Sequence, residues 1–162
     1  MVKLFCMLLA VFSLSACIPG ETTVSSDGLK TADESHQSQE TLDSQAESAL
    51  KITVGDHELL AAFEDNSSAE EFRELLEKGP ITIEMEDYGG FEKVGPLGTS
   101  LSRNDTHITT QPGDVILYQG NQITIYYGTN SWSFTRLARI DDPADLQEKL
   151  GEGTVSATFS LA

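Results

Sequence analysis

The amino-acid sequence predicts a mainly β fold, a closed antiparallel barrel of about eight strands with two short helices. Two observations support this prediction. Over most of residues 51–162, apolar and polar residues alternate with the period of two that is typical of half-buried strands. These short runs follow one another closely, with turn residues between them, so neighbouring strands are expected to pair as hairpins. Closing such a sheet into a barrel removes its exposed edges.

The first predicted elements are a hairpin and a helix. The segment "KITVGDHELLAAFE" indicates two short strands joined by Gly55 and Asp56, which suit a tight turn. The segment "SSAEEFRELLEKGP" has the signals of a helix in order. A capping box can begin at Ser67 or Ser68, because a glutamate follows each serine after three residues. A narrow apolar stripe follows, and Gly-Pro ends the helix.

The middle of the domain is predicted to be strands around one long connection. "ITIEMED" returns to period two, and the glycine-rich connection "YGGFEKVGPLGTSLSRNDT" follows it, with room for a short strand around residues 91–94. Connections of this length are usually functional or partly mobile. "HITT", "VILYQ", "QITIYYG" and "NSWSFTRLARI" are then strands, with Gly120 and Asn121 as a two-residue hairpin turn.

A second helix and a last strand complete the domain. In "DDPADLQEKLG", Asp142 is expected to be the N-cap, Pro143 the first helical residue and Gly151 the stop. In "GTVSATFSL", every second residue from Val155 to Leu161 is apolar and is expected to face the interior.

The N-terminus has the pattern of an export signal. "MVKLFCMLLAVFSLSAC" combines Lys3 with an apolar run that is too short for a membrane span. The last four residues of this segment, ending at Cys17, resemble the lipobox of bacterial lipoproteins. The resemblance implies that residues 1–16 are a signal peptide, that Cys17 carries lipid, and that the protein is anchored outside the cytoplasm to the cell membrane or outer membrane. The residue after the cysteine is Ile18 rather than an aspartate. In a cell with two membranes, the resemblance then favours sorting of the protein to the outer membrane. The alternative is an ordinary cleaved signal with an incidental cysteine.

Residues 17–50 are predicted to be the lipidated cysteine followed by a disordered tether, and residues 51–162 the barrel domain. From residue 18 to residue 50 the chain has no aromatic residue and is rich in polar ones, so it buries too little apolar area to fold. The chain's two cysteines are Cys6, in the signal, and Cys17. The barrel domain therefore has no disulfide, thiol nucleophile or cysteine metal ligand.

Charge and histidine content exclude several classes of partner. Residues 51–162 hold 8 Lys and Arg against 19 Asp and Glu, a formal balance of −11. This negative charge would repel nucleic acid and anionic lipid head groups, so no nucleic-acid partner is expected. Attachment to the membrane is therefore expected to come from the lipid on Cys17. His57 and His107 have no histidine or cysteine at ligand spacing, so we predict neither a metal nor a cofactor.

The segment "ITTQPGDVILYQGNQITIYYGTNSWSFTRLARI", with "YGGFEKVGPLG" and "SLSRND" before it, resembles the cyclophilin-like domain of small bacterial proteins, some of them lipoproteins. The resemblance implies an eight-stranded closed barrel capped by helices. True cyclophilins isomerise the bond before proline, using an arginine that donates toward the prolyl nitrogen beside an apolar pocket. The Phe-His-Arg segment that carries their arginine has no match here, so Arg136 or Arg103 would have to be the donor.

The main candidate site is on the strand that contains the chain's only tryptophan. With a strict period of two, one face of this strand holds Trp132, Phe134, Arg136, Ala138 and Ile140. An arginine on an apolar face needs a partner. It can pair with a carboxylate such as Glu84 or Asp114, extend to water at the strand end, or form the polar end of a pocket walled by the two aromatic rings. A bulge between Trp132 and Arg136 would change this assignment.

The second group of candidates is Arg103 and Asn104 in the long connection. Either this loop lies over the barrel and supplies polar contacts, or Asn104 bonds its own backbone in an Asx-turn. Tyr118, Tyr126 and Tyr127 are further candidates to line the same cup. We therefore predict a binding module for a small molecule or peptide segment; the alternatives are a peptidyl-prolyl isomerase and a ligand-free interaction domain of the cell envelope.

Overall fold

The computed structural model describes residues 49–162, so the predicted signal peptide, Cys17 and nearly all of the predicted tether lie outside the described residues. The elements are β1 (Leu50–Val54), β2 (His57–Phe63), α2 (Ser67–Glu77), β3 (Ile81–Tyr88), β4 (Glu92–Pro96), β5 (Thr106–Thr109), β6 (Asp114–Tyr118), β7 (Gln122–Tyr126), β8 (Ser131–Ile140), α3 (Leu146–Leu150) and β9 (Val155–Leu161).

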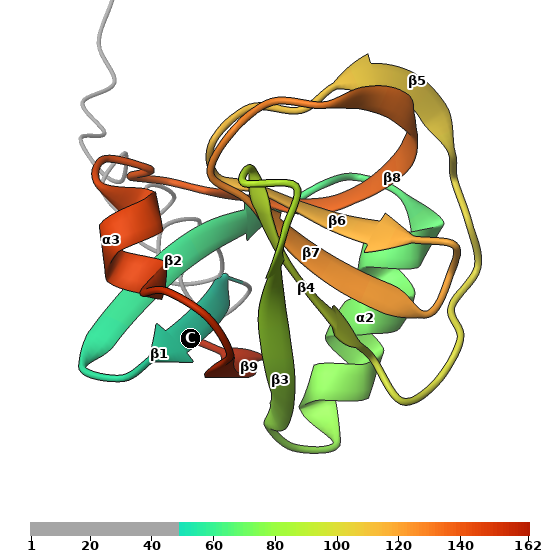
Figure 1. The fold of residues 1–162 in the computed structure, drawn as a ribbon. Coiled ribbons are helices and arrows are strands. Elements are labelled where there is room, and N and C mark those ends of the chain that lie inside the picture. The colour runs from blue at the N-terminus through green and yellow to red at the C-terminus, as the bar shows by residue number, and fades with distance from the viewer. Residues whose placement is uncertain (1–48) are drawn as a thin grey trace, which may run out of the picture. The chain divides into compact units, whose positions relative to one another are not determined.

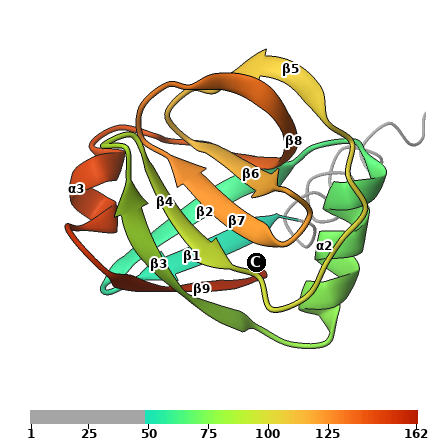
Figure 2. The ribbon, with the colours of Figure 1, turned by 45° about the vertical axis from the view of Figure 1, so that its right-hand side comes forward.

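Eight of these strands close into an antiparallel barrel, as predicted. Their order is β2-β1-β9-β3-β4-β7-β6-β8, and β8 pairs back onto β2. The remaining strand, β5, pairs with the first part of β8, and the two rise from the barrel as an arch (Figure 1). The last strand, β9, lies between β1 and β3 (Figure 2).

The apolar residues fill the barrel and fix the two helices against it. Ile52, Ile123 and Phe159 come from three different strands and are fully buried. The Phe72 ring of α2 packs edge-on against the Phe159 ring, with 6.0 Å between centroids. Burying one such side chain contributes about 1.5–3 kcal/mol. The helices lie on opposite sides of the barrel in both views (Figures 1 and 2).

The barrel begins one residue before the predicted boundary. Leu50 is fully buried and lies opposite Leu161 of β9. The backbone N–H of Ala162 then donates to the carbonyl of Ala49 at 2.9 Å. The first and last described residues are therefore joined by one ladder.

The start of α2 differs from the prediction. Its N-cap is Asn66, whose Oδ1 accepts a hydrogen bond from the backbone N–H of Ala69 at 3.0 Å. Ser68 is fully buried, and its hydroxyl donates instead to the Ser102 carbonyl at 2.6 Å. Neither predicted capping box forms, because Asn66 is the N-cap and the hydroxyls of Ser67 and Ser68 contact the long connection.

The start of α3 was also predicted too early. The helix begins at Leu146, after Asp145 in the left-handed region with φ of 53°. The Asp142 carboxylate accepts from the backbone N–H of Ala144 at 3.1 Å, which makes a turn before the helix. Asp142 is therefore not the N-cap.

The hairpin between β6 and β7 has three turn residues rather than two. Tyr118 pairs with Gln122, which leaves residues 119–121 outside the ladder. Gln119 and Gly120 both have positive φ, 53° and 80°. Glycine adopts this region freely, whereas a glutamine there is uncommon.

A bulge divides β8 into two halves. Val115 of β6 pairs with Ala138 and the next residue, Ile116, pairs with Arg136, so Leu137 is the extra residue. Ala138 and Leu137 both belong to the buried barrel core, whereas Phe134 packs with the separate cluster on the outer face. The predicted single face of Trp132, Phe134, Arg136, Ala138 and Ile140 is therefore wrong beyond Arg136.

Candidate functional site

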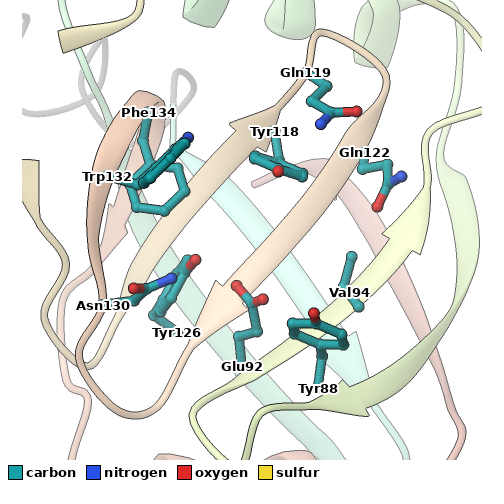
Figure 3. Close-up of a pocket in the computed structure, with 10 residues that line it drawn as sticks. All are labelled: Tyr88, Glu92, Val94, Tyr118, Gln119, Gln122, Tyr126, Asn130, Trp132 and Phe134. Atoms are coloured by element: carbon teal, nitrogen blue, oxygen red, sulfur yellow. The ribbon is translucent and has the colours of Figure 1, made fainter. Parts of the chain in front are cut away.

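A hollow of about 560 Å³, here called the cup, lies on the outer face of the barrel (Figure 3). Side chains from β3, β4, β7, β6 and β8 and from the turns beside them form it, because alternate residues of adjacent strands point to the same side of a sheet. The cup is lined by Tyr88, Glu92, Val94, Tyr118, Gln119, Gln122, Tyr126, Asn130, Trp132 and Phe134.

The aromatic rings of the cup pack against one another. Tyr126 stacks on Phe91 with 6.1 Å between centroids, and lies 5.7 Å from Phe134. Phe134 also meets the Tyr118 ring edge-on at 6.1 Å. Contacts of this kind hold rings in fixed orientations. The wall between β7 and β8 is therefore a packed surface.

Two large side chains of the cup remain open to solvent. Tyr88 is 63% exposed and Trp132 is 61% exposed, and Leu60 on β2 is the other large hydrophobic residue with high exposure in the described region. Figure 3 shows Trp132 and Tyr88 on different sides of the cup, with Glu92 between them. Exposed aromatic groups around a hollow are typical of binding surfaces.

Glu92 is the charged residue of the cup. It pairs with Tyr126 in the β4–β7 ladder and is only 7% exposed. Its Oε2 is buried and has no hydrogen-bond partner in the described part of the chain. Burial raises the pKa of Glu92, and a hydrogen bond with the Tyr126 side chain opposes this shift. Burial, followed by the effect of Glu92, raises the pKa of Tyr126.

The buried lysine next to Glu92 is not its counter-ion. Lys93 is fully buried, and adjacent strand residues point to opposite faces. Its Nζ lies 2.8 Å from Asp87 Oδ1 and donates to the Gly153 carbonyl at 2.6 Å. The pKa of Asp87 is lowered, chiefly by the hydrogen bond from Lys93. The positive charge of Lys93 is therefore balanced by Asp87 of β3 and does not neutralise Glu92.

Arg136 lies outside the cup and is ion-paired. Its Nη2 donates to Asp114 Oδ2 at 3.1 Å, and its Nη1 lies 3.4 Å from Glu64 Oε1. Asp114 is fully buried, and its Oδ1 accepts from Arg139 Nε at 3.1 Å. Of the predicted partners, Asp114 contacts Arg136 and Glu84 does not. The bulge at Leu137 brings both arginines to the outer face beside this one carboxylate.

Arg103 and Asn104 lie with Arg136 along a second hollow, here called the groove, of about 490 Å³. Arg103 forms an ion pair with Asp105. Asn104 Nδ2 donates to the hydroxyls of Ser67 at 2.8 Å and Ser68 at 2.6 Å. These bonds tie the long connection to the start of α2, in place of an Asx-turn.

The structure therefore divides the predicted site residues into two sets. Trp132 and Phe134 lie in the cup, together with Tyr118 and Tyr126, whereas Arg136, Arg103 and Asn104 lie along the groove. The remaining tyrosine candidate, Tyr127, donates to Asp87 at 3.1 Å and does not line the cup.

Tyr88 and Glu92 were not predicted as site residues, and both come from the segment that was predicted to be the long glycine-rich connection. An available signal was the short strand expected around residues 91–94, because a strand there brings an alternating set of side chains to the sheet face. Glu92 lies beside Tyr126 because of the register between β4 and β7. This register depends on the tertiary fold and cannot be read from either segment alone.

Residues 49–162 also lack two features that would indicate other kinds of site. Among these residues, no three His, Cys, Asp or Glu side chains are grouped closely enough to hold a metal ion. No helix in the same part of the chain is both long and apolar enough to cross a membrane.

Comparison with known protein families gives a match. No curated protein matches the chain. The model of the cyclophilin-like family matches residues 52–160, which include every strand of the barrel apart from the first two residues of β1 and the last residue of β9. The barrel, its two helices and this match together show that the chain belongs to the cyclophilin-like family.

Proposed function

We propose that the domain binds a small molecule or a peptide segment in the cup. The observation that carries this proposal is that two large exposed aromatic side chains, Tyr88 and Trp132, line one hollow beside a packed aromatic wall. Leaving such groups in water is unfavourable, and a ligand that covers them gains the hydrophobic contribution. The volume of the cup lies in the usual range for small-ligand sites.

The positions of the arginines favour binding over prolyl isomerisation. An isomerase of the cyclophilin type needs an arginine donor beside the apolar pocket. The described residues that line the cup include no arginine. Arg136 and Arg103 lie along the groove instead, where each is ion-paired with a carboxylate, although Arg136 Nε has no hydrogen-bond partner among the described residues.

Tryptophan fluorescence tests the proposal, because Trp132 is the only tryptophan in the chain and lines the cup. We expect that a panel of N-acetyl-Gly-X-Gly-amide peptides, with X varied over the natural side chains, contains members that change this fluorescence saturably. The same peptides should add RT ln(1 + [L]/Kd) to the free energy of unfolding, which raises the melting temperature. Replacing Tyr88 by alanine should weaken binding by about tenfold, since an exposed ring in contact with ligand contributes about 1–2 kcal/mol.

Leu60→Ala is the matched control, because Leu60 is a large exposed hydrophobic residue on β2, away from the cup. It should bind the panel as the unchanged protein does. Equal losses in both variants, or no saturable response to any peptide at millimolar concentration, would count against the cup as a binding site.

We further propose that lipid on Cys17 anchors the protein outside the cytoplasm. The support is the lipobox-like segment Leu14 to Cys17 after the short apolar run. Two or three acyl chains anchor stably, where one alone gives marginal attachment. The net charge of −16 gives no electrostatic attraction to anionic lipid, so the lipid would be the main source of attachment.

Radioactive palmitate labelling of the full chain in a bacterial host tests this anchor. We expect labelled protein in the membrane fraction, and loss of both label and membrane association in Cys17→Ser. The control is Cys6→Ser, because Cys6 lies within the predicted signal and should not be acylated. Label that persists in Cys17→Ser, or that is missing from the unchanged chain, would contradict the lipoprotein proposal.

A further inference from the structure

We propose that the occupant of the cup carries a positively charged group with N–H donors, an alkylammonium or guanidinium, that binds the carboxylate of Glu92. This inference rests on the proposed function and names the chemical class of the ligand.

The first argument is the unused acceptor on Glu92. Glu92 is only 7% exposed, yet its buried Oε2 has no hydrogen-bond partner among the described residues. A buried polar atom without a partner costs about 1–3 kcal/mol, more for a charged group. Figure 3 shows the carboxyl group directed into the space between Tyr126, Tyr118 and Tyr88. A ligand N–H in that space would supply the missing bond.

The second argument is the lack of a competing cation in the cup. Of the described residues that line it, Glu92 is the only charged one. Lys93 on the opposite face is held by Asp87 and the Gly153 carbonyl, so it does not neutralise Glu92. A neutral ligand would leave this charge uncompensated, whereas a cation offsets the desolvation of the carboxylate.

The third argument is the surroundings. The rings of Tyr88 and Tyr126 lie on either side of Glu92 (Figure 3), and π faces attract cations. The whole chain carries a net charge of −16, which favours the approach of cations over anions. Phosphate, sulfate and carboxylate ligands would meet repulsion from Glu92 itself.

The proposal implies a definite pH dependence. Burial raises the pKa of Glu92, and only its ionised form attracts a cation. Affinity for the cation should therefore rise as pH increases through the pKa of Glu92 in the free protein. The other titratable groups facing Glu92 are the hydroxyls of Tyr88, Tyr118 and Tyr126; Tyr127 of β7 and Lys93 of β4 lie close by on the other face. A lysine side chain stays protonated from pH 4 to about pH 9 and adds no step in that window.

The test compares the binding of three ligands. The first is N-acetyl-Gly-Lys-Gly-amide, the second is the same peptide with norleucine, an uncharged residue, in place of lysine, and the third is n-butylammonium. Trp132 fluorescence and thermal shift of the full chain measure the dissociation constants. We expect the lysine peptide to bind at least about tenfold more tightly than the norleucine peptide, and Glu92→Gln to remove this preference and its pH step. Glu84→Gln, at an exposed position on β3, is the control for overall charge and should keep both.

The two ligand sources are separated by the same data. Equal affinity for n-butylammonium and the lysine peptide indicates a free amine, and at least tenfold tighter binding of the peptide indicates a basic side chain in a peptide. Glu92→Gln is checked for a cooperative melting transition, and Tyr88→Ala provides a second variant with an independent loss of cation binding.

Two outcomes would overturn the inference, and they have different consequences for the proposed function. If the norleucine peptide binds as tightly as the lysine peptide and Glu92→Gln changes neither, the cup binds ligands but not through a cation. If neither peptide nor the amine changes fluorescence or melting temperature at millimolar concentration, the inference fails, and ligand binding in the cup fails with it only when no other peptide of the panel gives a saturable response.

Discussion

Replacing Asp114 by asparagine is expected to lower the free energy of unfolding by about 3 kcal/mol. Asp114 is fully buried, and its two oxygens accept hydrogen bonds from Arg136 and Arg139, each at 3.1 Å. Its Oδ2 also accepts the backbone N–H of Gln111 at 2.9 Å. Asparagine retains the approximate shape but removes the charge, which leaves the guanidinium of Arg136, only 21% exposed, with Glu64 alone at 3.4 Å.

Urea unfolding of the full chain followed by circular dichroism measures this loss, which corresponds to a fall in melting temperature of roughly 10 °C. The control is Asp141→Asn, at an exposed aspartate whose side chain makes no ion pair within the described region; its free energy of unfolding should change by no more than about 0.5 kcal/mol. A loss below 1 kcal/mol for Asp114→Asn would mean that the two arginines reach water freely.

Replacing Gly95 by alanine is expected to cost about 3 kcal/mol through lack of space. A Cβ added at Gly95 would lie 2.5 Å from the carbonyl oxygen of Glu84 and 2.6 Å from Cγ2 of Ile83. The first neighbour is backbone of β3, which is held in its own ladder with β9. The chain therefore has to shift, and the shift would disturb the strand that carries Glu92.

Gly90→Ala separates this steric effect from the conformational preference of glycine. Gly90 has φ of 74°, and an added Cβ meets nothing within 4 Å, so its cost is that of a strained backbone, about 1 kcal/mol. Unfolding free energies of the two variants decide the matter. Gly95→Ala should be the less stable by at least about 1 kcal/mol, and the reverse order would show that β3 and β4 separate easily.

The fold was predictable because strand alternation and turn residues are local signals. The first hairpin follows directly from Gly55 and Asp56, and the helix from residues 67–77 follows from its apolar stripe and Gly-Pro stop. The caps were not predictable in the same way. Ser68 was a good capping residue by local rules, but its hydroxyl bonds Ser102, 34 residues away.

The candidate site was predictable in part. Trp132 and Phe134 were identified from a strand pattern, and they do share a hollow. Arg136 is on the same face of β8 as these two residues, because the bulge follows it, but it lies farther along the strand and pairs with Asp114 and Glu64 outside the cup. The bulge at Leu137 instead changes the faces of Ala138 and Arg139, and no local signal in this strand marks it. The pairing of Glu92 with Tyr126 could not be predicted from the sequence, because the register between β4 and β7 brings the two residues together.

The position of β9 has a consequence for the order in which the domain folds. Because β9 lies between β1 and β3, the ladder that joins the start of the domain to its middle is absent until the last strand is available. Before that, β1 and β3 each present an unpaired edge, and such edges are prone to pair with other chains. Long-range pairings of this kind also slow folding, to about milliseconds to seconds for comparable β proteins. We therefore expect a nascent chain to acquire its barrel late, and to depend on protection from aggregation until residues 155–161 have been made.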